Sequence, residues 1–353
     1  MSAADLPFCR RVVTVPKPRG YTPAKIARGF LGRWPLPVVN YTSPEMQAAL
    51  AAILKQEQFD LIHLDSIHMA AYVPMLQKAT GAPMVYDWHN IESEAMRRYS
   101  LHERSLLRSR YAALTASRLW TLEQRALRET SGHLVCSDRE LVELQSRVPQ
   151  ARVAVIENGV DSGFFAASGD AAGDRRRIVF VGSMGYHANA EAAVYFARDI
   201  WPGISRRFPQ WTFTIVGANP TPAVLALHGS NHVEVTGTVP DVRPFYREAR
   251  AAIVPLRVGG GTRLKILEAM AAGVPVVSTT LGAEGLASSP AKDILIADRE
   301  EEWVAHLDAL SDGGLWSALS EAGRELIRAR YDWEAIGGKL WQAYSEWLYE
   351  PAH

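Results

Sequence analysis

The chain has 353 residues, which is typical of two domains, and its 38 basic and 38 acidic residues cancel, so no bulk positive field favours nucleic acid as a partner. Its two cysteines, Cys9 and Cys136, lie far apart in the sequence, so we expect no disulfide framework and a reducing, cytoplasmic location. No run reaches the roughly 18 apolar residues that a membrane-spanning helix needs.

Short apolar strands alternate with helical segments through the first half of the chain. The predicted strands cover residues 11–15, 59–65, 83–89, 133–137 and 153–157. Strands separated by helices predict a parallel sheet. A doubly wound domain normally opens with a strand and a tight glycine turn into a helix. Here Pro16 and Pro18 follow the first strand, and no such turn precedes residue 59. We therefore expect residues 1–167 to form an incomplete domain, without the opening strand and glycine loop.

His89 lies where the predicted strand 83–89 ends and a helix begins. In an open α/β sheet, that edge faces the ligand crevice. A lone histidine is more often structural, but Asp87, Asn90 and Glu92 are close in the sequence. The residues alone leave a ligand-binding role and a structural role as equal alternatives.

Residues 96–130 combine apolar side chains with eight arginines, at positions 97, 98, 104, 108, 110, 118, 125 and 128. A basic amphipathic helix or helix pair of this kind can lie against anionic lipid, which predicts peripheral contact with the inner face of the plasma membrane. The same pattern also fits a solvated helix face above a stripe of core residues.

The second half of the chain alternates more regularly and follows a Gly- and Asp-rich linker at residues 168–174. Its predicted strands cover residues 177–182, 211–217, 233–237, 251–256, 274–279 and 293–297, with helices that include 189–200 and 241–249. We expect a second α/β domain at residues 175–333. The last helix, within 334–353, is expected to pack back toward the first domain, and the two domains to face each other across a cleft.

The segment 258–273 carries the strongest chemical signal. Three glycines lead to Thr262 in a helix-capping position, and a predicted helix, 263–272, stops at Gly273. Arg263 and Lys265 would lie in its first turn, where each costs up to about 1 kcal/mol because the helix dipole is already positive. A diphosphate bound at this end would reverse the sign of that cost. The alternative is a surface pair of Lys265 with Glu268, worth at most about 0.5 kcal/mol.

Several other chemistries lack their residues. No Asp-x-Asp pair is present to hold a metal on a nucleotide diphosphate, and no zinc-binding spacing occurs. The segment Gly182-Ser-Met-Gly185 is not a complete dinucleotide-binding fingerprint. We therefore expect no metal and no cofactor, and an anion would be neutralised by the helix end, Arg263 and Lys265.

Five motifs then occur in order: Asn158-Gly-Val-Asp161, Phe180-Val-Gly-Ser183, Ile215-Val-Gly217, Gly237-Thr-Val-Pro-Asp241 and Leu267-Glu-Ala-Met-Ala-Ala-Gly-Val-Pro-Val-Val277. Together they resemble the retaining glycosyltransferases of family 4, and most closely the bacterial exopolysaccharide sugar transferases. The resemblance implies the GT-B fold, with two Rossmann-like domains. It also implies metal-independent transfer of a hexose from a nucleotide sugar to a polysaccharide or lipid-linked saccharide acceptor, which the first domain would bind.

The resemblance assigns roles on the donor side. Glu268 would hydrogen-bond the ribose hydroxyls, and Thr238 and Val239 would meet the base through their backbone. The groups near the diphosphate would be Arg263, Lys265, Gly182 and Ser183, and His89 would approach the sugar from the first domain.

The sequence departs from the family pattern at two places. Gly260 stands where the family often has a glutamate, so backbone N–H groups of Gly260 and Gly261, next to the capping Thr262, would take over contact with the sugar. The usual basic pair after strand 177–182 is also missing, and Arg263 and Lys265 would compensate. Two alternatives stay open: a non-catalytic nucleotide-sugar-binding partner subunit, and a GT-B nucleotide-sugar 2-epimerase.

Overall fold

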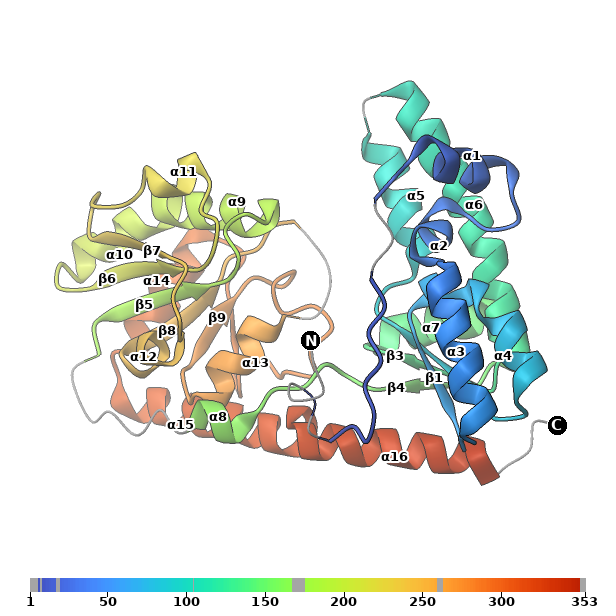
Figure 1. Cartoon of the computed structure of the whole chain (residues 1–353). Coiled ribbons are helices and arrows are strands. Elements are labelled where there is room, and N and C mark those ends of the chain that lie inside the picture. Colours follow the sequence, from blue (N-terminus) through green and yellow to red (C-terminus); the bar gives the residue numbers. More distant parts are fainter. Residues whose placement is uncertain are drawn as a thin grey trace. The chain divides into compact units, whose positions relative to one another are not determined.

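The computed structural model describes residues 6, 8–16, 20–103, 105–166, 175–258 and 263–349. The chain divides into two compact units (Figure 1). The N-terminal unit comprises Met1–Ile156 and Trp341–His353, and the C-terminal unit comprises Glu157–Leu340. Each unit contains one parallel sheet and its own hydrophobic core. The predicted linker 168–174 lies outside the described residues.

The sheet of the N-terminal unit has four parallel strands in the order of the chain. They are β1 (Ile62–Asp65), β2 (Met84–Trp88), β3 (Gly132–Val135) and β4 (Val153–Val155). The helices are α1 (Pro23–Leu31), α2 (Leu36–Tyr41), α3 (Pro44–Gln56), the 3₁₀ helix η2 (Ile67–Ala71), α4 (Val73–Ala79), α5 (Glu92–His102), α6 (Leu106–Glu129) and α7 (Asp138–Arg147). Four of the five strands predicted for this half are therefore confirmed.

The prediction of a strand at residues 11–15 is wrong. No strand in the described part of the chain pairs with this segment. Arg10 and Arg11 instead bind the carboxylate of Glu57 at 2.8 and 2.9 Å, and Val13 is exposed. The alternation of residues 11–15 resembles a half-buried strand, but an apolar pattern forms a strand only where a neighbouring strand can accept its backbone hydrogen bonds.

The core of the N-terminal unit is built on β2 and β3. Tyr86 and Trp88 are fully buried, and the Trp88 indole donates a hydrogen bond to Nδ1 of the buried His133 at 3.2 Å. A side chain at Gly132 would overlap the indole of Trp347, so the end of α16 (Trp333–Tyr349) packs directly on β3. Only glycine allows this close approach.

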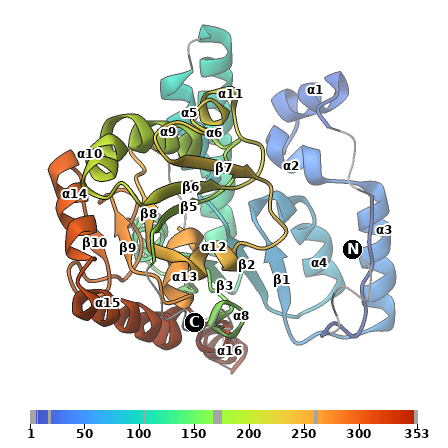
Figure 2. The same ribbon diagram turned by 90° about the vertical axis from the view of Figure 1, so that its left-hand side faces the viewer.

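The sheet of the C-terminal unit has six parallel strands in the order β10-β9-β8-β5-β6-β7 (Figure 2). They are β5 (Arg177–Val181), β6 (Thr212–Val216), β7 (Val233–Gly237), β8 (Ala249–Val254), β9 (Val276–Ser278) and β10 (Leu295–Ile296). All six strands predicted for this half are confirmed, most with shorter bounds. The strand order reverses between β5 and β8, which makes this pair the topological switch point of the sheet.

Two groups of helices accompany this sheet. In one group, α9 (His187–Tyr195), the π-helical turn η3 (Phe196–Ile200), α10 (Trp201–Arg207) and α14 (Glu300–Ala309) pack together. In the other, α13 (Leu264–Ala271) contacts α8 (Ser162–Ala166), α15 (Gly313–Leu326) and the π-helical turn η4 (Ile327–Tyr331). The crossovers through α9 and α13 run in opposite directions from the switch point, and right-handed crossovers then place the two groups on opposite faces.

Two short helices complete the unit, α11 (Pro222–Leu225) and α12 (Arg243–Arg247). The predicted helix 241–249 is thus shorter than expected, because Ala249 already belongs to β8. No helix within the described ranges combines the length and apolar character needed to cross a membrane.

Candidate functional site

The candidate donor site lies at the carboxyl edge of the C-terminal sheet, beside the switch point. The chain leaves β5 through Gly182 and Ser183 toward α9, and it leaves β8 toward α13. Because β5 and β8 are hydrogen-bonded neighbours, these two exits meet at one edge. This is the place where open α/β sheets form a crevice for ligands.

Lys265 is the central cation of this site. Its Nζ donates a hydrogen bond to Oδ1 of Asn189 at 2.6 Å and lies 4.8 Å from the centroid of the Phe180 ring. The side-chain amide of Asn189 is itself oriented, because its Nδ2 donates to the backbone carbonyl of Ser183 at 2.9 Å. Burial lowers the pKa of Lys265 to about 8, and the charge of Arg263 adds to that effect.

Two glycines make room for this cation. A Cβ at Gly182 would lie 2.9 Å from Nδ2 of Asn189 and 3.1 Å from Nζ of Lys265. A Cβ at Gly217, which has φ +152°, would overlap the carbonyl oxygen of Gly182. The two Val-Gly pairs that end β5 and β6 are therefore explained by close packing around Lys265.

The start of α13 differs from the prediction. The helix begins at Leu264, so Arg263 occupies the N-cap position and only Lys265 lies in the first turn. Arg263 is buried, and its Nη2 donates to the carbonyl of Leu281 at 3.4 Å. Burial lowers the pKa of Arg263, against the opposing effect of Tyr186 and Glu284. The predicted donor-binding residues Gly260, Gly261 and Thr262 lie outside the described residues.

Glu268 lies one turn after Lys265 and contacts a buried tyrosine. The hydroxyl of Tyr246 donates to Oε2 of Glu268 at 3.4 Å and lies equally far from the carbonyl of Lys265. Burial raises the pKa of Glu268, while Tyr246 and the charge of Lys265 act in the opposite direction. Within the described residues, Lys265 forms no salt bridge with Glu268, so the simple surface pair does not occur.

The remaining predicted donor residues follow β5 and β7. Ser183 and Thr238 are exposed, and Val239 is half-buried against the core. The backbone turns at Gly237, with φ +71°, so Thr238 and Val239 leave the edge strand of the sheet. Two strand spacings separate β7 from β5, which places Thr238 about 10 Å along the same sheet edge from Gly182.

In the N-terminal unit, His89 follows the carboxyl end of β2. Its Nε2 hydrogen-bonds Oδ1 of Asp65, and the register of the sheet places Asp65 beside Asp87. Burial lowers the pKa of His89, but the hydrogen bond and charge of Asp65, with the charge of Asp87, outweigh this effect and raise it. The ring is exposed, so His89 is not a core histidine.

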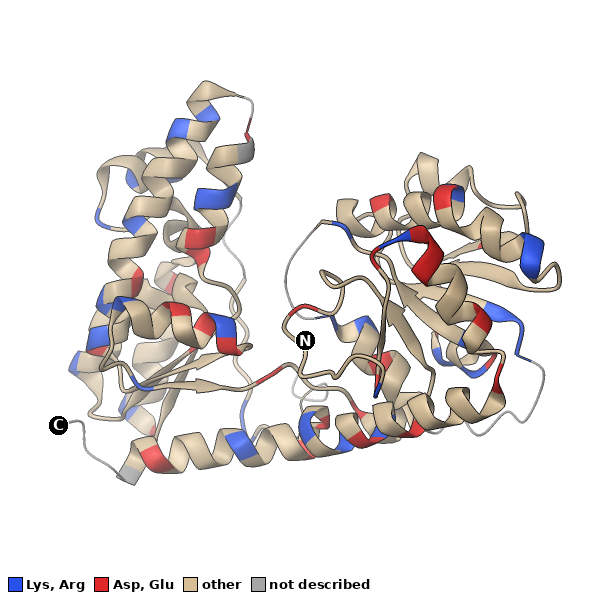
Figure 3. Ribbon diagram, turned by 180° about the vertical axis from the view of Figure 1, so that it is seen from behind, with Lys and Arg blue, Asp and Glu red and all other residues tan. Residues whose placement is uncertain are grey.

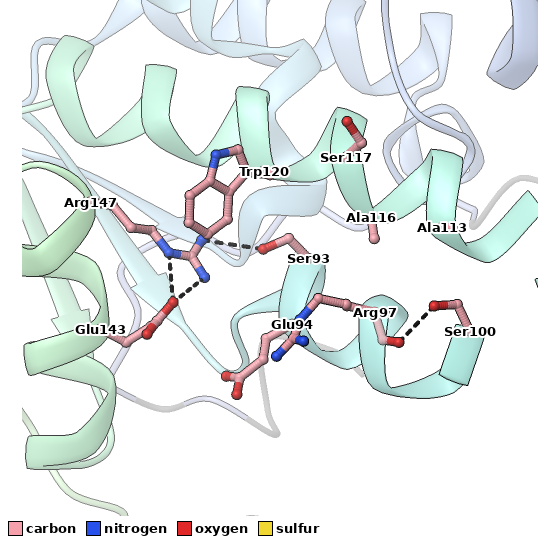
Figure 4. Close-up of a pocket in the computed structure, with 10 residues that line it drawn as sticks. All are labelled: Ser93, Glu94, Arg97, Ser100, Ala113, Ala116, Ser117, Trp120, Glu143 and Arg147. Carbon is pink, nitrogen blue, oxygen red and sulfur yellow. Dashed lines mark hydrogen bonds and ion pairs between the residues drawn. The ribbon is translucent and has the colours of Figure 1, made fainter. Parts of the chain in front are cut away.

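A cavity of about 320 Å³ lies between α5, α6 and α7 of the N-terminal unit (Figure 4). Its lining is formed by Ser93, Glu94, Arg97, Ser100, Ala113, Ala116, Ser117, Trp120, Glu143 and Arg147. The guanidinium of Arg147 lies 4.0 Å from the Trp120 ring centroid, and it donates to the buried Glu123 at 2.7 Å and to Glu143 at 2.8 Å. The Trp120 ring, next to polar side chains that hydrogen bonds fix in place, provides a surface on which a small polar ring can stack.

Three residues that contact the predicted site residues were not themselves predicted from the sequence: Asp65, Asn189 and Tyr246. The cavity of the N-terminal unit was not predicted either. Asp65 was detectable in principle, because it ends the predicted strand that precedes the strand of His89. Asn189 and Tyr246 lie inside predicted helices and carry no pattern of their own. Among the described residues, no group of three or more His, Cys, Asp or Glu side chains is arranged to hold a metal ion.

The chain matches two glycosyltransferase family models. Glycosyltransferase Family 4 matches residues 9–164, and Glycosyl transferases group 1 matches residues 175–312. A curated relative, an uncharacterized 44.6 kDa protein in the cps region of Klebsiella pneumoniae, is 23% identical over 138 residues. That match covers 37% of this chain and only 36% of the relative, about a third of its length.

Solved structures share the fold at low identity. Sucrose-phosphate synthase from Thermosynechococcus elongatus has a TM-score of 0.63 and 18% identity, covering 86% of this chain and 77% of that one. A glycosyltransferase from Rickettsia africae has a TM-score of 0.63 and 15% identity, with coverages of 88% and 84%. Anabaena HepE in complex with UDP has a TM-score of 0.61 and 15% identity, with coverages of 86% and 82%. With one model matching each half and this fold, the chain belongs to the group 1, family 4 glycosyltransferases of the GT-B class.

Proposed function

We propose that the chain transfers a hexose from a nucleotide-sugar donor to a saccharide or lipid-linked saccharide acceptor in cell-surface polysaccharide biosynthesis. The family match and the relative in a cps region support this assignment. The solved structures of HepE with UDP and with UDP-glucose support a nucleotide sugar as the donor. The family resemblance further implies that transfer retains the anomeric configuration and needs no metal.

The observation that carries the proposal is a cation at the switch point, Lys265, that forms no ion pair within the described residues. Lys265 is half-buried, its hydrogen-bond partner Asn189 is neutral, and its pKa is lowered to about 8. A cation in this state gains from an anionic ligand, because burial weakens its hydration and strengthens its Coulomb attraction. A diphosphate at the start of α13 would supply that anion.

The same arrangement fits the chemistry of sugar transfer. When the glycosidic bond to the donor breaks, negative charge develops on the leaving nucleoside diphosphate. Lys265 and the first N–H groups of α13 would stabilise that charge, and such fixed groups stabilise a transition state without reorganising. Glu268, held by Tyr246, would accept hydrogen bonds from the ribose, and Thr238 would lie near the base.

We place the acceptor on the N-terminal unit. His89 has its Nε2 engaged by Asp65, which leaves Nδ1 for a sugar hydroxyl. The cavity beside α5 begins at Ser93, four residues after His89, and its volume of about 320 Å³ fits one or two sugar rings. Trp120 would stack against such a ring, with Arg97 and Ser100 as hydrogen-bonding groups at the rim.

The test is a panel of nucleotide sugars with the full chain, with and without acceptor saccharides. Acceptor-dependent release of nucleoside diphosphate supports the transferase, and NMR of the product reads its anomeric configuration. Activity that survives EDTA supports metal independence. Donor binding without turnover would instead favour a partner subunit, and isomerised donor would favour a 2-epimerase.

A further inference from the structure

The turn between α5 and α6 presents large aliphatic side chains to solvent. Leu101 near the end of α5 is 70% exposed, and Leu106 and Leu107 at the start of α6 are 78% and 82% exposed. Figures 1 and 2 show these helix ends projecting beyond the rest of the N-terminal unit. Single exposed leucines are ordinary, but three within seven positions form a patch that needs an explanation.

A second apolar element is fixed to the same helix. On α1, Leu31 is 90% exposed, and Phe30 packs on Tyr111 of α6 with ring centroids 4.9 Å apart. Tyr111 lies one turn after Leu107. The Arg118 side chain donates to the carbonyls of Gly29, Phe30 and Gly32, which holds the carboxyl end of α1 against α6. Leu31 is therefore presented on a structured helix rather than on a loose segment.

Positive charge surrounds the leucines. Residues 97–110 contain five arginines and one glutamate, a net charge of +4. In the part of the chain that the structure describes, Arg97, Arg108 and Arg110 form no salt bridge, whereas Arg98 pairs with Glu94. Figure 3 shows Lys and Arg positions toward this end of the helix pair. We define Leu101, Leu106, Leu107, Arg108 and Arg110 as the basic tip.

We propose that the basic tip docks on an anionic lipid bilayer, with its leucines entering the headgroup region. Its charge complements that of anionic lipid, and arginines beside solvent-exposed leucines are typical of helices that bind at a membrane interface. Because the tip projects from the unit, the lipids of a bilayer can surround its side chains. A second copy of this chain would bring Arg108 and Arg110 of its own tip against the same two arginines, and this repulsion opposes self-association through the tip.

The proposal is independent of the transferase reaction. Lipid binding by the basic tip is expected whether or not the chain turns over a nucleotide sugar, because the tip shares no residue with the donor site. Failure of one assignment therefore leaves the other standing. If both hold, the acceptor side of the enzyme would work at a membrane surface.

The experiment is co-sedimentation of the full chain with vesicles of phosphatidylcholine, alone or with about 30 mol% phosphatidylglycerol. We expect binding only to the anionic vesicles, weakened when the salt is raised from about 0.15 to about 0.5 M. The triple variant Leu101→Ser, Leu106→Ser, Leu107→Ser and the double variant Arg108→Gln, Arg110→Gln are each expected to lose at least about tenfold in affinity.

Two matched controls separate the tip from general surface effects. Arg128→Gln changes an exposed arginine on the same helix, eighteen residues from Arg110 and thus about 27 Å along the axis, beyond the Debye length. Leu225→Ser removes an exposed leucine on α11 of the other unit. Both are expected to bind vesicles like the unchanged chain, and circular dichroism checks that each variant is folded.

Absent binding, equal binding to neutral and anionic vesicles, or equal losses in the controls would overturn the proposal. Sedimentation equilibrium tests the competing occupant. A concentration-dependent dimer that the leucine variant abolishes would assign the tip to a second copy, and would also overturn it.

Discussion

The two units of this protein position their candidate functional side chains in different ways. In the C-terminal unit, the strand order reverses between β5 and β8, and the exits of these two strands bring Lys265, Asn189 and Gly182 together. In the described residues of the N-terminal unit, the order β1-β2-β3-β4 contains no reversal. Its cavity is walled instead by α5, α6 and α7 and braced by a buried ion pair. A switch point provides a crevice by topology, whereas a helix-walled cavity depends on particular side chains.

The largest effect is expected when the buried ion pair of Glu123 with Arg147, beside the N-terminal cavity, is broken. Glu123→Ala leaves Arg147 buried with only Glu143 as an anionic partner and removes the acceptor for the backbone N–H of Ser93. Breaking a buried pair costs about 3–5 kcal/mol, and we expect the lower end because Glu143 remains. Denaturant unfolding measures it. The control Glu129→Ala, on the exposed side of the same helix, should stay within about 0.5 kcal/mol of the unchanged chain.

The next effect is expected at the switch point. Lys265→Ala should lower kcat/KM by about 10²–10³-fold, because it removes a fixed cation from the charge that develops on the leaving group. Steady-state kinetics with the preferred donor measures the loss. Lys292→Ala, an exposed lysine of the same unit, serves as control. Equal kinetics of the two variants would remove Lys265 from the site.

Gly182→Ala tests whether the packing around Lys265 matters as much as its charge. The added methyl would approach Asn189 and Lys265 at 2.9 and 3.1 Å and push the cation from its place. Small misplacements of this kind cost up to about 100-fold in rate. Gly313→Ala, which meets nothing within 4 Å, is the matched change and should leave kcat/KM unaltered. A normal kcat/KM for G182A would contradict the close-packing argument.

The same site also predicts a dependence of donor binding on pH. The pKa of Lys265 is lowered to about 8, so the free site is increasingly neutral above that pH. Donor affinity should be level below about pH 7.5 and then fall by up to about tenfold per pH unit while the donor phosphates stay ionised. Calorimetry in buffers of different ionisation enthalpy should show proton uptake on binding above pH 8. If donor affinity does not change with pH up to 10, the lowered pKa of Lys265 has no role in donor binding.

The acceptor-side assignment can be sharpened independently. Trp120→Ala should raise the acceptor KM by about tenfold through lost stacking, and leave donor Kd unchanged. Because Trp120 also covers Arg147, the unfolding experiment used for Glu123 separates a binding defect from a stability defect. If Trp120→Ala changes donor affinity but not the acceptor KM, the acceptor does not bind in the cavity beside α5.

Much of the C-terminal unit was predictable from local patterns. Buried parallel strands are apolar throughout, and strong turn and capping residues separate them from helices, so β5 to β10 could be located from neighbouring residues alone. The anion site at the start of α13 could be predicted for the same reason. The helix dipole, the first N–H groups of the helix and Lys265 all lie within a few residues of one another in the sequence. The failed strand at residues 11–15 shows the limit, since alternation does not say whether a partner strand exists.

Tertiary structure alone decided which distant side chains meet. The bond between Lys265 and Asn189 spans 76 positions and exists because β5 and β8 are neighbours, while the pairing of His89 with Asp65 follows from the register of β1 and β2. The brace of Arg147 with Glu123 and the exposed leucines of the basic tip likewise follow from helix packing. Periodicity reports which face of an element is apolar, but strand order and helix packing determine what that face touches.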